Sequence, residues 1–136
     1  MSAGHNILND LLRSFTDNGP GTVRLTATSE SAGGTKIPNE RLIQIVIPTW
    51  GNANNILILP DPDPGKIVII AGAATGGELR TTSPSTIAIN GGFGANVESA
   101  VAVNQMVFAI CESPTSWKAF TIAANGTLAG LEVPVV

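Results

Sequence analysis

The chain has 136 residues, a length that suits one domain, and 43% of them are hydrophobic. Only 12% are charged, well below the usual share of about 25%. The net charge is −3, and the seven Lys and Arg residues are spread singly along the chain, which argues against binding nucleic acid. A small domain with so few charges needs a cover of Thr, Ser and Asn or a protein partner, so we expect a homo-oligomer or a docked component.

Residues 1–20 predict a helical arm that precedes a single β-domain over residues 21–136. The segment HNILNDLLRSF has apolar residues at helical spacing, and DNGPG then ends the helix. A helix this short is marginal by itself, so its apolar stripe should pack on its own domain or on a neighbouring subunit. The stripe consists of Ile7, Leu8, Leu11, Leu12 and Phe15, and these are candidate interface residues.

From residue 22 onward the hydrophobic period changes to two. TVRLTAT predicts a half-buried strand, whereas RLIQIVI and NILIL are dense in Ile and Leu and predict strands buried on both faces or at an interface. Further strands are predicted at KIVIIAG, GELRTTS, STIAIN, NQMVFAICE and SWKAFTIA, and Asn125-Gly126 predicts a hairpin turn.

About eight short strands without βα alternation or an evident internal repeat favour an all-β fold. We expect an antiparallel β-sandwich, jelly roll or barrel-like domain with a short N-terminal helix or arm.

The stretch TIAINGGFGANVESA has a strand followed by three glycines, the kind of loop that can hold a phosphate. It lacks the third spaced glycine and the lysine of the phosphate-binding motifs, so we interpret its glycines as turn residues. The chain has one His and one Cys, which argues against a zinc site, and Cys111 lies in an apolar run typical of a buried thiol. We therefore expect no cofactor, no metal and no catalytic activity.

Two aromatic residues in loops are further candidate interface residues. Trp50 lies in the turn-rich segment PTWGNANN and is either an interface anchor or part of the core. Phe93 lies in the glycine loop.

Residues 60–136 carry a resemblance in three ordered blocks, GGELR, PSTIAINGG and ESA, followed by Cys111 and Ser116-Trp117. This half of the chain resembles the capsid decoration, or cement, proteins of tailed bacteriophages. The resemblance implies a β-rich virion protein that self-associates, with a trimer favoured, and binds the capsid exterior between major capsid protein subunits. It also implies synthesis in the bacterial host cytoplasm, with neither nucleic acid nor a membrane as partner.

Two alternatives remain open. A receptor- or glycan-binding module of a tail fibre or spike would use the Thr-, Ser- and Asn-rich surface and Trp50. A hydrolase would need two carboxylates in one cleft, for example Glu78 and Glu98, which spacing in the sequence does not reveal.

Overall fold

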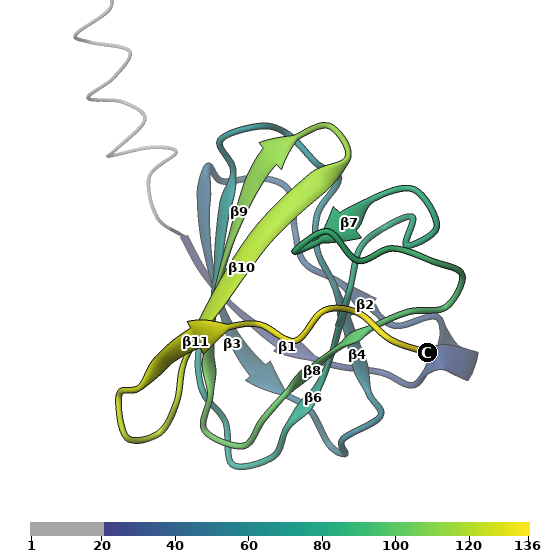
Figure 1. The fold of residues 1–136 in the computed structure, drawn as a ribbon. Coiled ribbons are helices and arrows are strands. Elements are labelled where there is room, and N and C mark those ends of the chain that lie inside the picture. Colours follow the sequence, from purple (N-terminus) through teal and green to yellow (C-terminus); the bar gives the residue numbers. More distant parts are fainter. Residues whose placement is uncertain (1–20) are drawn as a thin grey trace, which may run out of the picture.

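The computed structural model describes residues 21–136, which form two β-sheets and almost no helix (Figure 1). The seven-stranded sheet contains β1 (Gly21–Thr26), β3 (Ile43–Thr49), β5 (Ile67–Ile70), β7 (Ala88–Ile89), β9 (Met106–Ser113), β10 (Ser116–Ile122) and β11 (Leu128–Gly130). The four-stranded sheet contains β2 (Thr35–Lys36), β4 (Ile56–Ile58), β6 (Gly77–Arg80) and β8 (Ser99–Val101). A 3₁₀ turn, η1 (Glu30–Ala32), follows β1. The predicted arm, residues 1–20, lies outside the described residues.

Both sheets are mixed, so the expectation of an antiparallel fold is wrong for the first half of the chain. From β1 to β6 the chain enters the two sheets alternately, and β1, β3 and β5 are parallel, as are β2, β4 and β6. After each strand the chain crosses to the other sheet and then crosses back, so that successive strands of one sheet run in the same direction. Parallel strands require a crossover connection of this kind. Val23, Val46 and Ile70 therefore stand in one register across three successive turns of this path.

Hairpin pairing begins late in the chain. β9 pairs with β5 and β10, and β10 pairs with β11, all antiparallel. The turn between β10 and β11 contains Gly126 at φ 85°, where glycine carries no steric cost, and this confirms the hairpin predicted at Asn125-Gly126. Strand pairing runs from β1 to β11 and from β2 to β8 without returning to its first strand, so within residues 21–136 neither sheet is a closed barrel.

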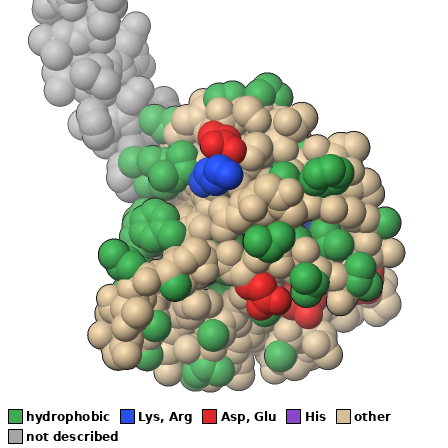
Figure 2. Space-filling view, viewed as in Figure 1, with side chains coloured by type: hydrophobic (Ala, Val, Ile, Leu, Met, Phe, Trp, Pro, Cys, Tyr) green, Lys and Arg blue, Asp and Glu red, His purple; other side chains and the backbone are tan. Residues whose placement is uncertain are grey.

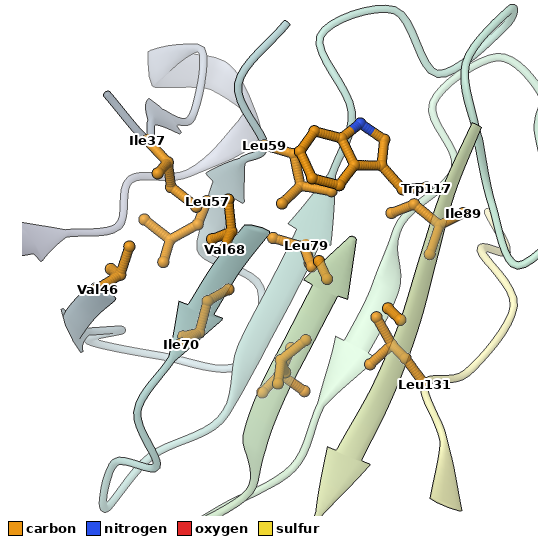
Figure 3. Close-up of a cluster of buried hydrophobic side chains, with 14 of the residues drawn as sticks. Ile37, Val46, Leu57, Leu59, Val68, Ile70, Leu79, Ile89, Trp117 and Leu131 are labelled. Carbon is orange, nitrogen blue, oxygen red and sulfur yellow. The ribbon is translucent and has the colours of Figure 1, made fainter. Parts of the chain in front are cut away.

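One hydrophobic core joins the two sheets (Figure 3). Val46, Val68 and Ile70 come from the seven-stranded sheet, and Leu57 and Leu79 come from the four-stranded sheet. All five are fully buried. The fully buried indole of Trp117 lies in the same cluster.

Trp50 also belongs to this core. Its exposed fraction is 1%, and its ring lies against Gly77 at the start of β6, where a Cβ atom would meet the indole. Of the two alternatives for Trp50, core packing is correct, and the proposal of an interface anchor is wrong. The loop holds Trp50 through Asn55, whose side chain donates a hydrogen bond of 2.7 Å to the Trp50 carbonyl.

Candidate interaction surfaces

The seven-stranded sheet has hydrophobic side chains on the face turned away from the core. Its central row is formed by Ile45, Ile69, Phe108 and Phe120, which follow one another in register across β3, β5, β9 and β10. The two phenylalanine rings are stacked, with centroids 5.1 Å apart and planes 7° from parallel. We call this surface the apolar outer face; besides the central row it includes Ile43, Ile47, Ile67, Met106, Ile110, Ile122 and Leu128.

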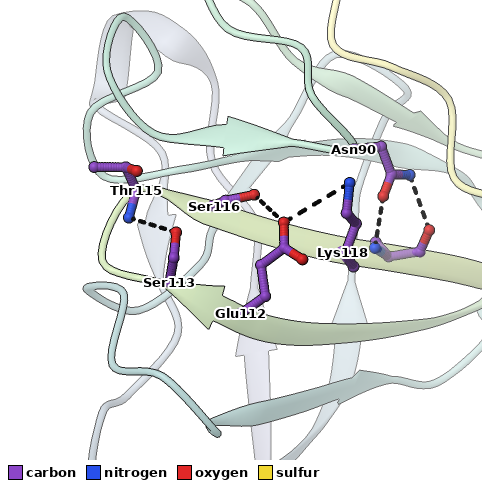
Figure 4. A network of polar contacts seen from close by, with 7 residues as sticks. Asn90, Glu112, Ser113, Thr115, Ser116 and Lys118 are labelled. Atoms are coloured by element: carbon purple, nitrogen blue, oxygen red, sulfur yellow. Dashed lines mark hydrogen bonds and ion pairs between the residues drawn. The ribbon is translucent and has the colours of Figure 1, made fainter.

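Charged groups lie only at the margins of the apolar outer face. At one end Lys118 Nζ is 3.7 Å from Glu112 Oε1, and Ser116 Oγ donates a hydrogen bond of 2.6 Å to the same oxygen (Figure 4). The Lys118 and Glu112 side chains are 58% and 43% exposed, so this ion pair is well solvated. Arg24, on β1, flanks the face at its edge. In the view of Figure 2, charged side chains are few among the hydrophobic and other groups of the molecular surface.

A second apolar surface surrounds Phe93, whose side chain is 66% exposed. The neighbouring Gly92 lies so close to Val133 and Pro134 that a Cβ atom there would collide with them. Beyond Pro134, Val135 exchanges two backbone hydrogen bonds of 2.9 Å with Glu98. We call the exposed apolar side chains of this loop and of the adjoining C-terminal segment the Phe93 patch; they are Phe93, Val133 and Val135.

The glycine loop that carries Phe93 is a turn between strands, as the absence of the phosphate-binding motifs predicts. Asn90 and Gly91 have φ values of 51° and 85°, which reverse the chain after β7. Gly92 N donates to Ile89 O at 2.9 Å, and Gly94 N donates to Pro84 O at 2.8 Å. The backbone donors of these two glycines are thus satisfied within the loop.

A polar hollow of about 530 Å³ lies along the four-stranded sheet. Three carboxylates, Glu30, Glu78 and Glu98, line it together with Asn54 and Asn96. The structure therefore brings Glu78 and Glu98 into one hollow, the arrangement that the hydrolase alternative requires. Their strands explain it, because Glu78 follows Gly77 on β6 and Glu98 directly precedes β8, the antiparallel neighbour of β6.

Arg80 is the cation that compensates these carboxylates. Its guanidinium forms an ion pair with Glu98 and a second one, 3.2 Å long, with Glu30. The Arg80 and Glu98 side chains are only 14% and 12% exposed, whereas Glu30 is largely in solvent. Burial alone would lower the pKa of Arg80, but the hydrogen bonds and charges of Glu98 and Glu30 raise it overall, so Arg80 stays protonated.

Within residues 21–136 the Glu78 carboxylate forms no ion pair, and its pKa is raised. Burial is the main cause, the negative charges of Glu98 and Glu30 add to it, and Arg80 opposes it. A carboxyl group with a raised pKa beside a second carboxylate is a feature of hydrolytic sites, although ion-pair networks that only stabilise a fold produce it too.

No group of three or more His, Cys, Asp or Glu that could hold a metal ion is found in residues 21–136. Within the same range, no helix is long and apolar enough to cross a membrane. Cys111 is buried, and its thiol donates to the Ser113 carbonyl at 3.1 Å.

Comparisons with known proteins give no relative for this chain: no family model matches it, and searches of curated proteins and of solved structures found no significant match.

Proposed function

We propose that this chain is a non-enzymatic β-sandwich protein of a bacteriophage virion, which binds the outer surface of the capsid and cements adjacent major capsid protein subunits. The exposed apolar surface carries the proposal. Exposed apolar groups that gather on a soluble domain mark contacts with other proteins, and this domain has two such surfaces. The charges near the apolar outer face lie at its margins, and the Phe93 patch adjoins Glu98. The resemblance of the sequence blocks to decoration proteins supplies the identity of the partner.

Two of the resemblance blocks adjoin the C-terminal segment of the Phe93 patch: Gly92, the end of PSTIAINGG, lies against Val133, and Glu98, the start of ESA, is hydrogen-bonded to Val135. GGELR covers β6, PSTIAINGG covers β7 and the start of the glycine loop, and ESA covers the start of β8. Arg80 and Glu98, from two different blocks, form the partly buried ion pair described above. We therefore propose the Phe93 patch as the surface that faces the capsid.

Cementing a shell needs only modest energy from each copy. Many copies that each bridge neighbouring subunits raise the cost of separating those subunits under internal DNA pressure, because linked contacts reinforce one another. A homo-oligomer, with a trimer as the favoured form, would span several capsid subunits at once.

Cryo-electron microscopy of the parent virion tests the location. We expect density for this chain on the outside of the shell, with Phe93 turned toward a major capsid subunit. Density on the tail alone, or a bare shell, would overturn the proposal and favour the tail-fibre or spike alternative.

Co-sedimentation with undecorated shells tests the surface. Phe93→Ser should weaken binding about five- to thirtyfold, since a central apolar anchor contributes on the order of 1–2 kcal/mol. Leu128→Ser is a matched control, because Leu128 is 67% exposed, nearly the same fraction as Phe93, but lies on the apolar outer face. If both variants bind the shells as well as the unmodified chain does, the Phe93 patch is not part of the interface.

The polar hollow supports a second candidate function, binding or hydrolysis of a glycan. It has two Asn side chains for hydroxyl groups and the carboxylate pair Glu78 and Glu98. Incubation of the full chain with host cell-wall and capsular polysaccharides decides this: turnover that is lost in Glu78→Gln would establish a hydrolase, and no binding or turnover would exclude these glycans as ligands.

A further inference from the structure

The apolar outer face is unusual because the sheet is hydrophobic on both sides. A sheet with one face in water alternates hydrophobic and polar residues, whereas in β3 and β5 the buried Val46 and Ile70 alternate with Ile45 and Ile69. Strands of this composition are typical of sheets that are covered on both faces. Within residues 21–136 the cover exists on the core side alone.

We infer that residues 7–15 of the same chain cover the apolar outer face, with their apolar stripe against the central row. Within residues 21–136 nothing covers the apolar outer face, and the sequence of residues 7–15 predicts an apolar stripe that has to pack on another surface. A helix of this length is marginal in water unless its apolar side packs, and the outer face leaves Phe120, Ile110 and Leu128 exposed. This inference does not depend on the capsid assignment.

The position of Gly21 favours the arm of the same chain, and not that of a second copy, as the segment that covers the apolar outer face. Gly21 starts β1, the edge strand of this same sheet, and pairs with Gln44 of β3. The link from Phe15 to Gly21 spans up to about 20 Å when extended. Strands are about 4.8 Å apart, so β5 and β9 lie roughly 10 and 14 Å from β1, within that reach.

The dimensions of the two surfaces also agree. A nine-residue helix is about 13 Å long, enough to cross three strands of the sheet. A short tether raises the local concentration of the arm to the millimolar range, which favours it over a second copy of the chain at ordinary protein concentrations.

The charge pattern fits the same placement. The central row has no charged residue, and the charges on this side of the described sheet, Arg24, Glu112 and Lys118, lie at its margins. On the predicted helix, Asp10 and Arg13 fall away from the apolar stripe, so they would stay in water when the stripe is buried.

Photo-crosslinking of the full chain tests the contact. A benzophenone amino acid replaces Leu11, which belongs to the stripe. The sample is a one-to-one mixture of unlabelled and heavy-isotope-labelled chains, so that a crosslink within one chain can be told from a crosslink between two chains. We expect crosslinks from position 11 to β3, β5 and β9, joining peptides of the same isotopic label. The same probe at Arg13, on the opposite side of the predicted helix, should give few such links.

Crosslinks that join peptides of different labels would overturn the inference in favour of an arm exchanged with a second copy. Crosslinks to the four-stranded sheet or the Phe93 patch alone would overturn it as well.

A dye that fluoresces on apolar surfaces provides an independent measurement. The double variant Leu8→Lys/Leu11→Lys should release the arm and increase dye fluorescence several-fold, whereas Asn9→Lys, outside the stripe, should not. Unchanged emission from the buried Trp50 and Trp117 would show that the β-domain remains folded. Equal dye binding by both variants would contradict the inference. Shell binding is a separate measurement, so either proposal can fail alone.

Discussion

Asn90 and Ala119 are joined by hydrogen bonds in both directions (Figure 4). Asn90 Nδ2 donates to the Ala119 carbonyl at 2.9 Å, and Asn90 Oδ1 accepts from Ala119 N at 2.8 Å. Nδ2 also donates to the Leu131 carbonyl at 2.9 Å. One side chain thus connects the glycine loop, β10 and the C-terminal segment that leads to the Phe93 patch.

Asn90→Ala should destabilise the protein by about 2–4 kcal/mol, since it removes the side-chain partner of Ala119 N and of the Leu131 carbonyl and puts alanine at a positive φ. The Ala119 carbonyl loses one of its two hydrogen bonds and keeps the one from Leu131 N. Urea unfolding measures the loss. Asn104→Ala is the control, because Asn104 has a similar φ of 57° and an exposed side chain. An equal loss in both variants would attribute the effect to backbone strain instead of the hydrogen bonds.

The longer strands could be predicted from the sequence because their pattern is local. The hydrophobic runs at RLIQIVI, NQMVFAICE and SWKAFTIA correspond to β3, β9 and β10. The dense Ile and Leu content of RLIQIVI and NILIL predicted strands that are buried on both faces or at an interface. All three residues of β4, from NILIL, are buried, whereas the outer side chains of β3 are half-buried. The hairpin at Asn125-Gly126 is equally local, because the turn residues themselves determine it.

The parallel winding could not be predicted in the same way. Val23, Val46 and Ile70 are in register although long loops of different composition separate them, so no repeat is visible in the sequence. β2 and β8 are short strands in polar or glycine-rich segments, and their pairing partners, not their own residues, make them strands. The meeting of Arg80, Glu98 and Glu30 depends on this same pairing and has no local signal in the sequence.

Gly77→Ala should disrupt the core around Trp50. A Cβ atom at position 77 would lie less than 3.0 Å from three atoms of the fully buried indole, which has no room to move away. We expect a loss of about 2–4 kcal/mol and a change in tryptophan emission. Gly130→Ala is the matched control, since a Cβ atom there meets nothing within 4 Å. A similarly small effect of both substitutions would contradict the packing described for Trp50.

Arg80→Gln should cost more stability than Lys118→Gln. The first substitution leaves Glu98 partly buried without its counter-ion, at about 1–3 kcal/mol, and the second removes an exposed pair worth less than about 0.5 kcal/mol. Thermal unfolding in low salt compares the two variants directly. If Lys118→Gln were the more destabilising, the structural role assigned to Arg80 would be wrong.

Glu78→Gln should stabilise the protein at neutral pH. The pKa of Glu78 is raised in the folded state above its ordinary value of 4.5, mainly by burial, so ionisation of Glu78 opposes folding. The free energy of unfolding of the unmodified chain decreases as the pH rises through this raised pKa. The variant has no carboxylate at position 78 and does not lose this stability. We expect a gain of less than about 1 kcal/mol at pH 7, because the carboxylate is partly solvated.

This advantage should disappear below pH 4.5, where Glu78 is protonated in both the folded and the unfolded chain. Urea unfolding of both proteins across pH 4–8 measures the dependence, with Glu132→Gln, an exposed carboxylate, as the control. A gain that stays constant over the whole range would show that it does not come from ionisation.

Cys111 should be unreactive in the folded protein. Burial raises the pKa of the Cys111 thiol, so little of it is present as thiolate. The thiol is also buried and donates a hydrogen bond to the Ser113 carbonyl, so a reagent cannot reach it in the folded protein. Iodoacetamide at pH 8 should modify the native chain at least about a hundredfold more slowly than the chain in urea, since reaction requires opening of the core strands. A cysteine introduced by Val103→Cys, at a 55% exposed position between β8 and β9, provides the fast reference in the same fold. Native labelling of Cys111 at the rate of that reference would mean that β9 and β10 open readily, which would contradict the closely paired register of these two strands.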